Sequence, residues 1–410
     1  FLTHPVQNEA VACISGISNL AFAFFCFLSL YFYLKLSSTS HEKAPVRGWG
    51  MTAVVLMAYL GALLAKEQAI VFLAIVLLLE YFFKSKSGRP FVRRSVLSLG
   101  LMGVTAGYFL FRKFGLGGSA LSFFANPFEF WLRVLSIPRV LLTYLQTIFF
   151  PNDLHYYRST DVLLPKLVPG LVLAAVAVLF AFSLRKLFPE RFRLAVFGLS
   201  WFLVSLVPLC LLPLINEYSL LLTSEHFLYF PLFGFLLFFL TVAQDWGDRI
   251  FKPYSSNVML AAVIVLTGIF VPLNIRLNTY WRAEIPLFER SVRFEPRMGR
   301  LRILLATAYY QAGQPDQAIG HYRRALSIME DYYQKVTDAK PKNFYLNYLK
   351  EIHFNLAHCY ESKNKWEQAL GEYNSALMLD PQGSQFYTNR GVVYLYLGQL
   401  DNAIKDSGSG

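Results

Sequence analysis

The chain has 410 residues, of which 55% are hydrophobic, 17% aromatic and 16% charged. Soluble globular proteins carry about 25% charged residues, so this composition excludes an ordinary soluble domain over most of the chain. The formal net charge is +12, and residues 1–278 hold 22 of the 38 Lys and Arg residues but 12 of the 26 Asp and Glu residues. Because the more polar tail shows no basic groove interleaved with stacking aromatics, we attribute the excess charge to membrane orientation and not to nucleic-acid binding.

Apolar segments of membrane length follow one another through the first two thirds of the chain. The hydrocarbon core of a bilayer is about 30 Å thick, which takes roughly 20 apolar residues as a helix, and spans of about 17 residues still fit. The sequence predicts eight crossings, over residues 11–34, 49–65, 68–83, 95–111, 167–187, 194–212, 226–244 and 256–275. We therefore expect an all-α fold with a polytopic membrane domain over residues 1–278.

A ninth apolar segment, residues 128–150, differs because it contains Arg133, Pro138, Arg139 and Gln146. Charges inside a span are costly, whereas an amphipathic helix in the interface keeps its Arg side chains in water. We expect this segment not to cross. The basic loops KSKSGRPFVRRS (84–95) and RKLFPERFR (185–193) then share one face, which the positive-inside rule assigns to the cytoplasm.

The unusual polar stretches all fall on the opposite, outer face in this topology. They are HPVQNEAV (4–11), KEQ (66–68), FPNDLHYYRSTD (150–161) and NEYSLLLTSEH (216–226), and the C-terminal tail lies on the same side. Polar groups at membrane depth are expensive and tend to mark a working site. The candidate donor-binding and substrate-binding residues are His4, Glu9, Lys66, Glu67, Asp153, His155, Arg158, Glu217, Glu225, His226 and Tyr229.

Each of these residues also has an ordinary structural explanation. Asn8 and Glu9 are good first-turn helix residues, and Pro5 suits a helix start. Lys66 lies between two short spans and can simply snorkel to the interface. Residues 153–158 and Glu217 fit solvated loops equally well. The sequence leaves both explanations open at these positions.

From Trp281 onward the pattern changes to that of paired amphipathic helices. Ala318, Tyr322 and Ala325 recur 51 residues later, one 34-residue period plus a 17-residue insertion, and part of the set recurs again 34 residues beyond. The positions that match this first set are Ala369, Tyr373 and Ala376, and then Ala403. A second set with the same spacing lies on the preceding helix of each repeat and consists of Leu305, Ala306 and Tyr309, then Leu356, Ala357 and Tyr360, then Arg390, Gly391 and Tyr394. They resemble tetratricopeptide repeats, in which small residues let helices approach and aromatics fill the gap. We predict repeats over residues 279–406, opened by the half unit 281–296, and a flexible tail over 407–410.

The order of the two domains and four motifs resemble the transmembrane and tetratricopeptide-repeat O-mannosyltransferases, which belong to the GT-C glycosyltransferases. The motifs are HPVQNEAV, AKEQAIV (65–71), SEHFLYFP (224–231) and NTYWRAEIPLFERSVRFEP (278–296). Three positions depart from the family pattern, because Gln7 and Asn8 replace a His and a Thr, and His226 replaces an Arg.

The resemblance implies an enzyme that moves a mannose-like hexose from a polyprenyl-phosphate sugar to a Ser or Thr hydroxyl of a secreted protein. It also implies that a cation occupies the position of His226. The family's catalytic base lies on an acidic pair upstream of the HPV motif, so we expect it before Phe1 and expect residues 1–410 alone to be inactive. The sequence contains no N-x-Ser/Thr glycosylation site. We therefore favour a bacterial inner membrane with periplasmic repeats over an endoplasmic reticulum membrane with luminal repeats.

Two other function classes compete with the enzyme. A non-enzymatic membrane-anchored scaffold would use the repeats to recruit proteins in an envelope complex, and a transporter would move lipid-linked sugar. The clustered polar motifs favour the enzyme, the repeats alone favour the scaffold, and we see no paired broken helices of the transporter kind. No residue set has metal-ligand spacing and no Gly-rich phosphate loop appears, so the sequence supports no divalent metal and no cofactor with certainty. The expected ligands are a lipid-linked sugar donor and a protein partner.

Overall fold

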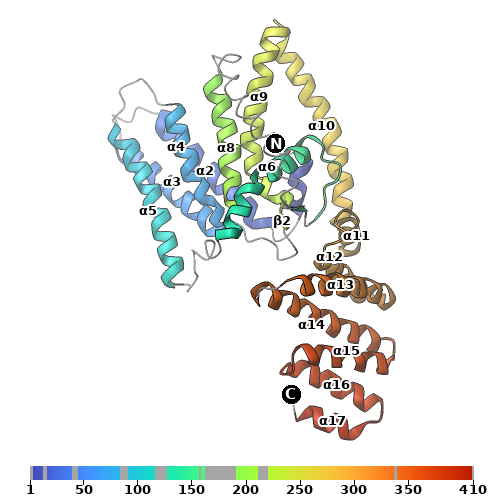
Figure 1. Cartoon of the computed structure of the whole chain (residues 1–410). Coiled ribbons are helices and arrows are strands. Elements are labelled where there is room, and N and C mark those ends of the chain that lie inside the picture. The colour runs from blue at the N-terminus through green and yellow to red at the C-terminus, as the bar shows by residue number, and fades with distance from the viewer. Residues whose placement is uncertain are drawn as a thin grey trace. The chain divides into compact units, whose positions relative to one another are not determined.

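The computed structural model describes residues 3–12, 16–38, 45–83, 91–115, 127–156, 158–161, 191–210, 220–336 and 339–408. The described part is almost entirely helical (Figure 1). The chain divides into two compact units, which we call unit 1 and unit 2. Unit 1 comprises Phe1–Leu154, Thr160–Leu214 and Thr223–Thr279, and unit 2 comprises His155–Ser159, Ile215–Leu222 and Tyr280–Gly410.

The elements of unit 1 are α-helices joined by short 3-10 helices, which are labelled η. They are η1 (Pro5–Gln7), α1 (Asn8–Ala12), α2 (Ile17–Ser38), α3 (Pro45–Ala65), η4 (Glu67–Ala69), α4 (Ile70–Phe82), α5 (Phe91–Gly115), α6 (Pro127–Phe149), α8 (Phe192–Cys210), η7 (Glu225–Leu228), α9 (Pro231–Ile250) and α10 (Ser255–Tyr280). Two strands of three residues, β1 (Ser159–Asp161) and β2 (Leu220–Leu222), pair with each other.

Seven of the eight predicted crossings coincide with α-helices, and the eighth, residues 167–187, lies outside the described residues. By length and hydropathy, two helices in the described part are able to cross a membrane, Ile17–Leu36 and Ser255–Tyr280. Trp49–Ala65 and Phe192–Pro208 are apolar but shorter, and α4 has only 13 residues because η4 forms the first turn of its segment. The all-helical prediction is confirmed for the described residues, whereas fewer helices than we predicted are both long and apolar enough to cross a membrane.

The core of unit 1 joins α2, α3, α4, α5 and α8 with the turn before α9. Trp201 lies in it at 1% exposure, with ring centres 5.9 Å from Phe197, 5.2 Å from Phe230 and 5.1 Å from Phe233. Aromatic rings at this separation and tilt attract one another beyond their area of contact. The packing between α8 and α9 is therefore built around one tryptophan.

Helices α8 and α9 approach most closely at two glycines. A Cβ on Gly198 would lie 2.6 Å from the backbone nitrogen of Phe238, and one on Gly234 would lie 2.7 Å from that of Phe202. Small residues at such crossings let two helix backbones pack directly, as is common between membrane helices. Any larger residue must push the two helices apart.

The outer surface of unit 1 carries large apolar side chains. None of the apolar stretch of α10 is buried. Its exposed residues include Leu260, Ile264, Val265, Ile269 and Ile275, each at least 57% exposed. Contiguous apolar surface of this extent is unusual on a protein that faces water on all sides.

Unit 2 is a stack of helix pairs. Its helices are α11 (Glu284–Phe294), α12 (Gly299–Gln311), α13 (Pro315–Lys335), α14 (Ala339–Glu361), α15 (Trp366–Leu379), α16 (Ser384–Tyr396) and α17 (Leu400–Ser407). The residues that define the repeat pattern form its core, since Ala318, Tyr322, Ala325, Ala369 and Tyr373 are all at most 1% exposed. Helix α17 ends at Ser407, which is the first residue of the predicted tail.

The turn inside each repeat follows the same spacing as the core. Gly313, Asn364 and Gly398 have φ values of +72°, +55° and +72°, and they are 51 and then 34 residues apart. A left-handed residue after a helix allows the chain to reverse, and Gly or Asn adopts it at least strain. Each repeat thus closes its first helix with the same device.

The 17-residue insertion lengthens two helices and adds no separate element. Helix α13 has 21 residues against 14 in the equivalent α15, and α14 has 23 against 13 in the equivalent α16. The seven and ten extra residues together equal the insertion. Tyr345, Leu349 and Ile352 of the lengthened α14 are at most 4% exposed, so the added turns extend the core.

The first helix of unit 2 is covered by a segment that follows α6 in the chain. The ring of His155 stacks on Phe294 with centres 4.8 Å apart, and its Nε2 lies 3.6 Å from Oε1 of Glu295. Tyr156 meets Trp281 edge to face at 6.0 Å. These two residues therefore pack on α11, the predicted half unit.

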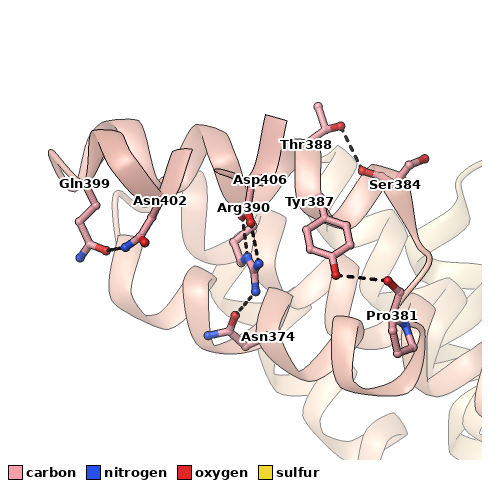
Figure 2. Close-up of polar contacts among 9 residues, drawn as sticks. All are labelled: Asn374, Pro381, Ser384, Tyr387, Thr388, Arg390, Gln399, Asn402 and Asp406. Atoms are coloured by element: carbon pink, nitrogen blue, oxygen red, sulfur yellow. Dashed lines mark hydrogen bonds and ion pairs between the residues drawn. The ribbon is translucent and has the colours of Figure 1, made fainter. Parts of the chain in front are cut away.

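At the other end of unit 2, Arg390 joins the last three helices (Figure 2). Its Nε and Nη2 donate to the two carboxylate oxygens of Asp406 in α17, each at 2.7 Å, and its Nη1 donates to Oδ1 of Asn374 in α15 at 2.7 Å. Hydrogen bonding to Asp406 raises the pKa of Arg390. Arg390 occupies the repeat position of Leu305 and Leu356, so the last repeat replaces an apolar contact by an ion pair.

Candidate functional site

The polar stretch that opens the chain folds into η1 and α1. The backbone N–H of Val6 donates to Nδ1 of His4 at 3.3 Å, which leaves Nε2 to donate to the carbonyl oxygen of Ile148 in α6 at 3.0 Å. Burial lowers the pKa of His4 to about 4, although the bond to Ile148 acts in the opposite direction. His4 is therefore a neutral residue that links η1 to α6, and both of its ring nitrogens form hydrogen bonds within the protein.

Glu9 is 2% exposed and binds one residue with both carboxylate oxygens. Its Oε2 accepts the backbone N–H of His226 at 3.0 Å, and its Oε1 accepts a hydrogen bond from Nδ1 of the same residue at 2.9 Å. A carboxylate in this position fixes the imidazole orientation and places a proton on Nδ1. The other ring nitrogen, Nε2, has no hydrogen-bond partner in the part of the chain that the structure describes.

Lys66 directly follows α3 in the turn before η4. Its Nζ donates to Oδ1 of the buried Asn19 in α2 and lies 5.3 Å from the ring centre of Phe227 in η7. Among the described residues no carboxylate forms an ion pair with it. Burial lowers the pKa of Lys66 to about 8, while the charge of Glu9 acts in the opposite direction. An ammonium group with only neutral partners suits an anionic ligand.

A small recess is formed by residues of α2, η4, α4, α8, η7 and α9. Its lining combines polar and apolar side chains, from Asn19, Phe22, Gln68, Val71, Ser205, His226, Phe227, Tyr229, Phe230 and Pro231. Asn19, His226 and Phe227 also contact Lys66 or Glu9.

Other predicted residues of unit 1 lie around this group in different ways. Glu225 is 2% exposed at the start of η7, and Tyr229 lines the recess. Glu67 points elsewhere, because its half-exposed carboxylate pairs with Arg112 near the end of α5. Asp153 follows α6 and is partly exposed. We expected Glu67 to face the same site as Lys66, but adjacent residues in the turn between α3 and α4 project to different neighbours.

The remaining predicted residues are not part of this group. His155 and Arg158 are 6% and 8% exposed and belong to unit 2, where His155 packs on α11. We named both as candidate donor-binding residues, with a solvated loop as the alternative explanation. In the structure the ring of His155 stacks on Phe294 of α11. Glu217 lies outside the described residues.

Sequence reasoning missed three residues that complete the group. Asn19 holds Lys66, Phe227 lies under the ammonium group, and Ser205 lines the recess with an Oγ that has no partner in the described structure. Asn19 interrupts the apolar run that opens α2, and a polar residue inside a predicted span is a signal that could have identified it. Phe227 and Ser205 carry no such signal. No group of three His, Cys, Asp or Glu side chains able to hold a metal ion occurs within the described residues.

Comparison with known proteins identifies repeats in unit 2. Three segments match models described as tetratricopeptide repeat, residues 301–332, 350–382 and 384–407. Among solved structures, two crystal structures of MamA are similar at 17% identity and a TM-score of 0.18, with 30% of this chain covered and 83% and 78% of those chains. A search of curated proteins gives no match. The three matched segments identify unit 2 as a stack of tetratricopeptide repeats, which are protein-binding modules.

Proposed function

We propose that the protein, in its full-length form, is a membrane glycosyltransferase that moves a hexose from a polyprenyl-phosphate sugar to a protein hydroxyl on the outer face of a membrane. The observation that carries the proposal is the group formed by Glu9, His226 and Lys66: a buried carboxylate–imidazole pair near an ammonium group with no carboxylate partner in the described residues. The motifs that contain these residues are the ones that resemble the O-mannosyltransferases.

The surface of unit 1 supports its place in a membrane. Lipid is the solvent that accommodates the exposed apolar side chains of α10 without cost, and the buried Gly198–Gly234 crossing is a contact typical of membrane helices. Two helices of membrane length would already anchor the chain. The polytopic topology with repeats on the outer face, in a bacterial inner membrane, is part of the proposal.

The chemistry follows from what each side chain is able to do. Departure of a lipid phosphate is helped by cations and hydrogen-bond donors aimed at the developing charge. Lys66 supplies the cation and His226, oriented by Glu9, supplies a ring nitrogen beside the recess. Glu9 is not the base in this proposal, because both of its oxygens are already occupied. The base comes from the acidic pair that the resemblance implies.

The repeats complete the proposal by binding a protein. Tetratricopeptide arrays expose extended surfaces on stacked helix pairs, and the array in unit 2 is held at its two ends by His155 on Phe294 and by Arg390 on Asp406. We assign it the binding of the acceptor protein or of a partner that delivers the acceptor.

The test is a transfer assay with the full-length protein in lipid nanodiscs, using radiolabelled polyprenyl-phosphate mannose and a secreted Ser/Thr-rich protein as acceptor. We expect Lys66→Met to lower transfer by at least tenfold. Lys35→Met is the matched control, since Lys35 lies near the other end of α2 from Asn19, and we expect it to transfer normally. Equal activity of wild type and Lys66→Met would exclude the assigned site.

One alternative is supported by the repeat matches alone: a membrane-anchored scaffold that recruits an envelope protein and catalyses nothing. It predicts that the full-length protein transfers no sugar from any polyprenyl-phosphate donor but still captures a protein through residues 280–410. Capture that survives Lys66→Met, together with no transfer by wild type, would favour the scaffold.

A further inference from the structure

Three polar side-chain atoms of the opening stretch are buried without a hydrogen-bond partner in the described structure. They are Nε2 and Oε1 of Gln7, which is 3% exposed, and Oδ1 of Asn8, which is 7% exposed. In the neighbouring residues, by contrast, both ring nitrogens of His4 and both carboxylate oxygens of Glu9 form hydrogen bonds. An unpaired buried polar group is about as unfavourable as a lost hydrogen bond, so this compact set needs an explanation.

The two amides are held in place by the surrounding structure. Nδ2 of Asn8 donates to Oδ1 of Asn278 in α10 at 2.7 Å, which fixes the direction of the unpaired Asn8 oxygen. The elements that carry the amides, η1 and α1, both pack against η7, which contains His226. Gln7 and Asn8 also directly precede Glu9 in the chain.

The chemistry of the unpaired atoms indicates what they would bind. They offer one NH2 group and two carbonyl oxygens, all uncharged, next to the carboxylate of Glu9. A phosphate has mainly acceptor oxygens and is repelled by such a set. A hydroxyl group both donates and accepts, and neighbouring hydroxyl groups on a sugar ring match a carboxamide and a carbonyl side by side.

We propose that Gln7 and Asn8 form a subsite for neighbouring hydroxyl groups of a neutral sugar and that this subsite selects the hexose of the donor. The inference rests on the proposed function, because it takes the donor to be a polyprenyl-phosphate sugar. The phosphate is then bound by Lys66 and the sugar by the two amides. Mutations at Lys66 and at Gln7 should therefore separate the contribution of the phosphate to affinity from that of the sugar.

The experiment compares two probes on the full-length protein in nanodiscs: a polyprenyl-phosphate mannose and the same polyprenyl phosphate without sugar. Gln7→Met keeps the length of the side chain and removes its two polar atoms. We expect it to weaken binding of the mannose lipid about tenfold, which corresponds to about 1.4 kcal/mol, and to leave binding of the bare phosphate lipid unchanged. Gln146→Met, on the exposed side of α6, is the matched control and should change neither.

The possible outcomes separate the subsite from the proposed function. If Gln7→Met leaves the ratio of the two affinities unchanged while wild type binds both lipids, the subsite is wrong and the donor site stands. If wild type binds neither lipid, the proposed function fails and the subsite with it. A ligand-free melt gives an independent check: we expect Gln7→Met to keep or raise the melting temperature, because no protein bond is lost. A fall of several degrees would show that Gln7 is satisfied by ordered water and would overturn the subsite.

Discussion

Unit 1 and unit 2 expose different kinds of side chain. In unit 1, Leu260, Ile264 and Ile269 are 57–61% exposed, while Glu9 and Asn19 are at most 5% exposed. In unit 2, Tyr322 and Tyr373 are at most 1% exposed, while the Lys335–Asp331 pair has 53% of each side chain exposed. The second arrangement is that of a protein surrounded by water, and the first is the one from which we propose a membrane location for unit 1. Each prediction below acts on one unit.

The largest effect is expected at the end of unit 2. Asp406→Ala leaves the guanidinium of Arg390 without its bidentate partner, and breaking a largely buried ion pair costs about 3 kcal/mol. Asp331→Ala removes an exposed pair and should cost less than about 1 kcal/mol. Hydrogen exchange of α16 and α17 in the full chain measures both. Equal loss of protection in the two variants would contradict the account.

The closest helix contact of unit 1 should be nearly as sensitive. Gly234→Leu forces α8 and α9 apart, since a Cβ alone meets backbone at 2.7 Å, and overpacking of this kind costs about 1–3 kcal/mol. Gly103→Leu in α5, where a Cβ meets nothing within 4 Å, is the matched control. Thermal unfolding in detergent measures the difference, and we expect unit 2 to melt unchanged in both variants.

Unit 1 should also lose stability in acid through His4. The folded pKa of about 4 lies below the ordinary 6.5, so the unfolded chain binds the extra proton first. The contribution of His4 is complete above pH 6.5 and is lost as the pH falls from 6.5 to 4. In His4→Gln the melting temperature of unit 1 should depend less on pH between 6.5 and 4. A dependence as steep as that of wild type would exclude His4 as the source of the acid sensitivity.

The smallest effect concerns the segment that covers α11. Tyr156→Ala removes the edge-to-face contact with Trp281, and aromatic contacts contribute about 0.5–1.5 kcal/mol. Although residue 156 precedes the repeats by more than a hundred positions, the loss of protection should appear in α11 and α12. Protection lost only in α6 would show that the segment belongs to unit 1.

The sequence predicted unit 2 in more detail than unit 1 for a physical reason. In a repeat array the same core positions recur, so the assignment of Ala318 to the core is supported by the equivalent Ala369. Each helix of unit 1 occurs only once in the sequence and has no such equivalent. The sequence predicted the length of the insertion, 17 residues. It did not predict that these residues would form extra turns of α13 and α14, because the helical spacing of apolar residues continues through the insertion.

The candidate site was predicted in part. Polarity beside apolar runs identified Glu9, Lys66 and His226, but not that Glu9 binds His226 217 positions away or that Asn19 holds Lys66. Such pairings depend on how helices pack, and one sequence carries no record of them. For His155, polarity alone did not indicate that the ring stacks on Phe294.

Native mass spectrometry of the full-length protein in nanodiscs with polyprenyl-phosphate mannose shows whether Lys66 helps to bind the donor. We expect one bound lipid-linked sugar on wild type and on Lys35→Met, and none on Lys66→Met at the same lipid concentration. Equal occupancy on all three, or on none, would contradict the assignment of the Lys66, Glu9 and His226 group as the donor site.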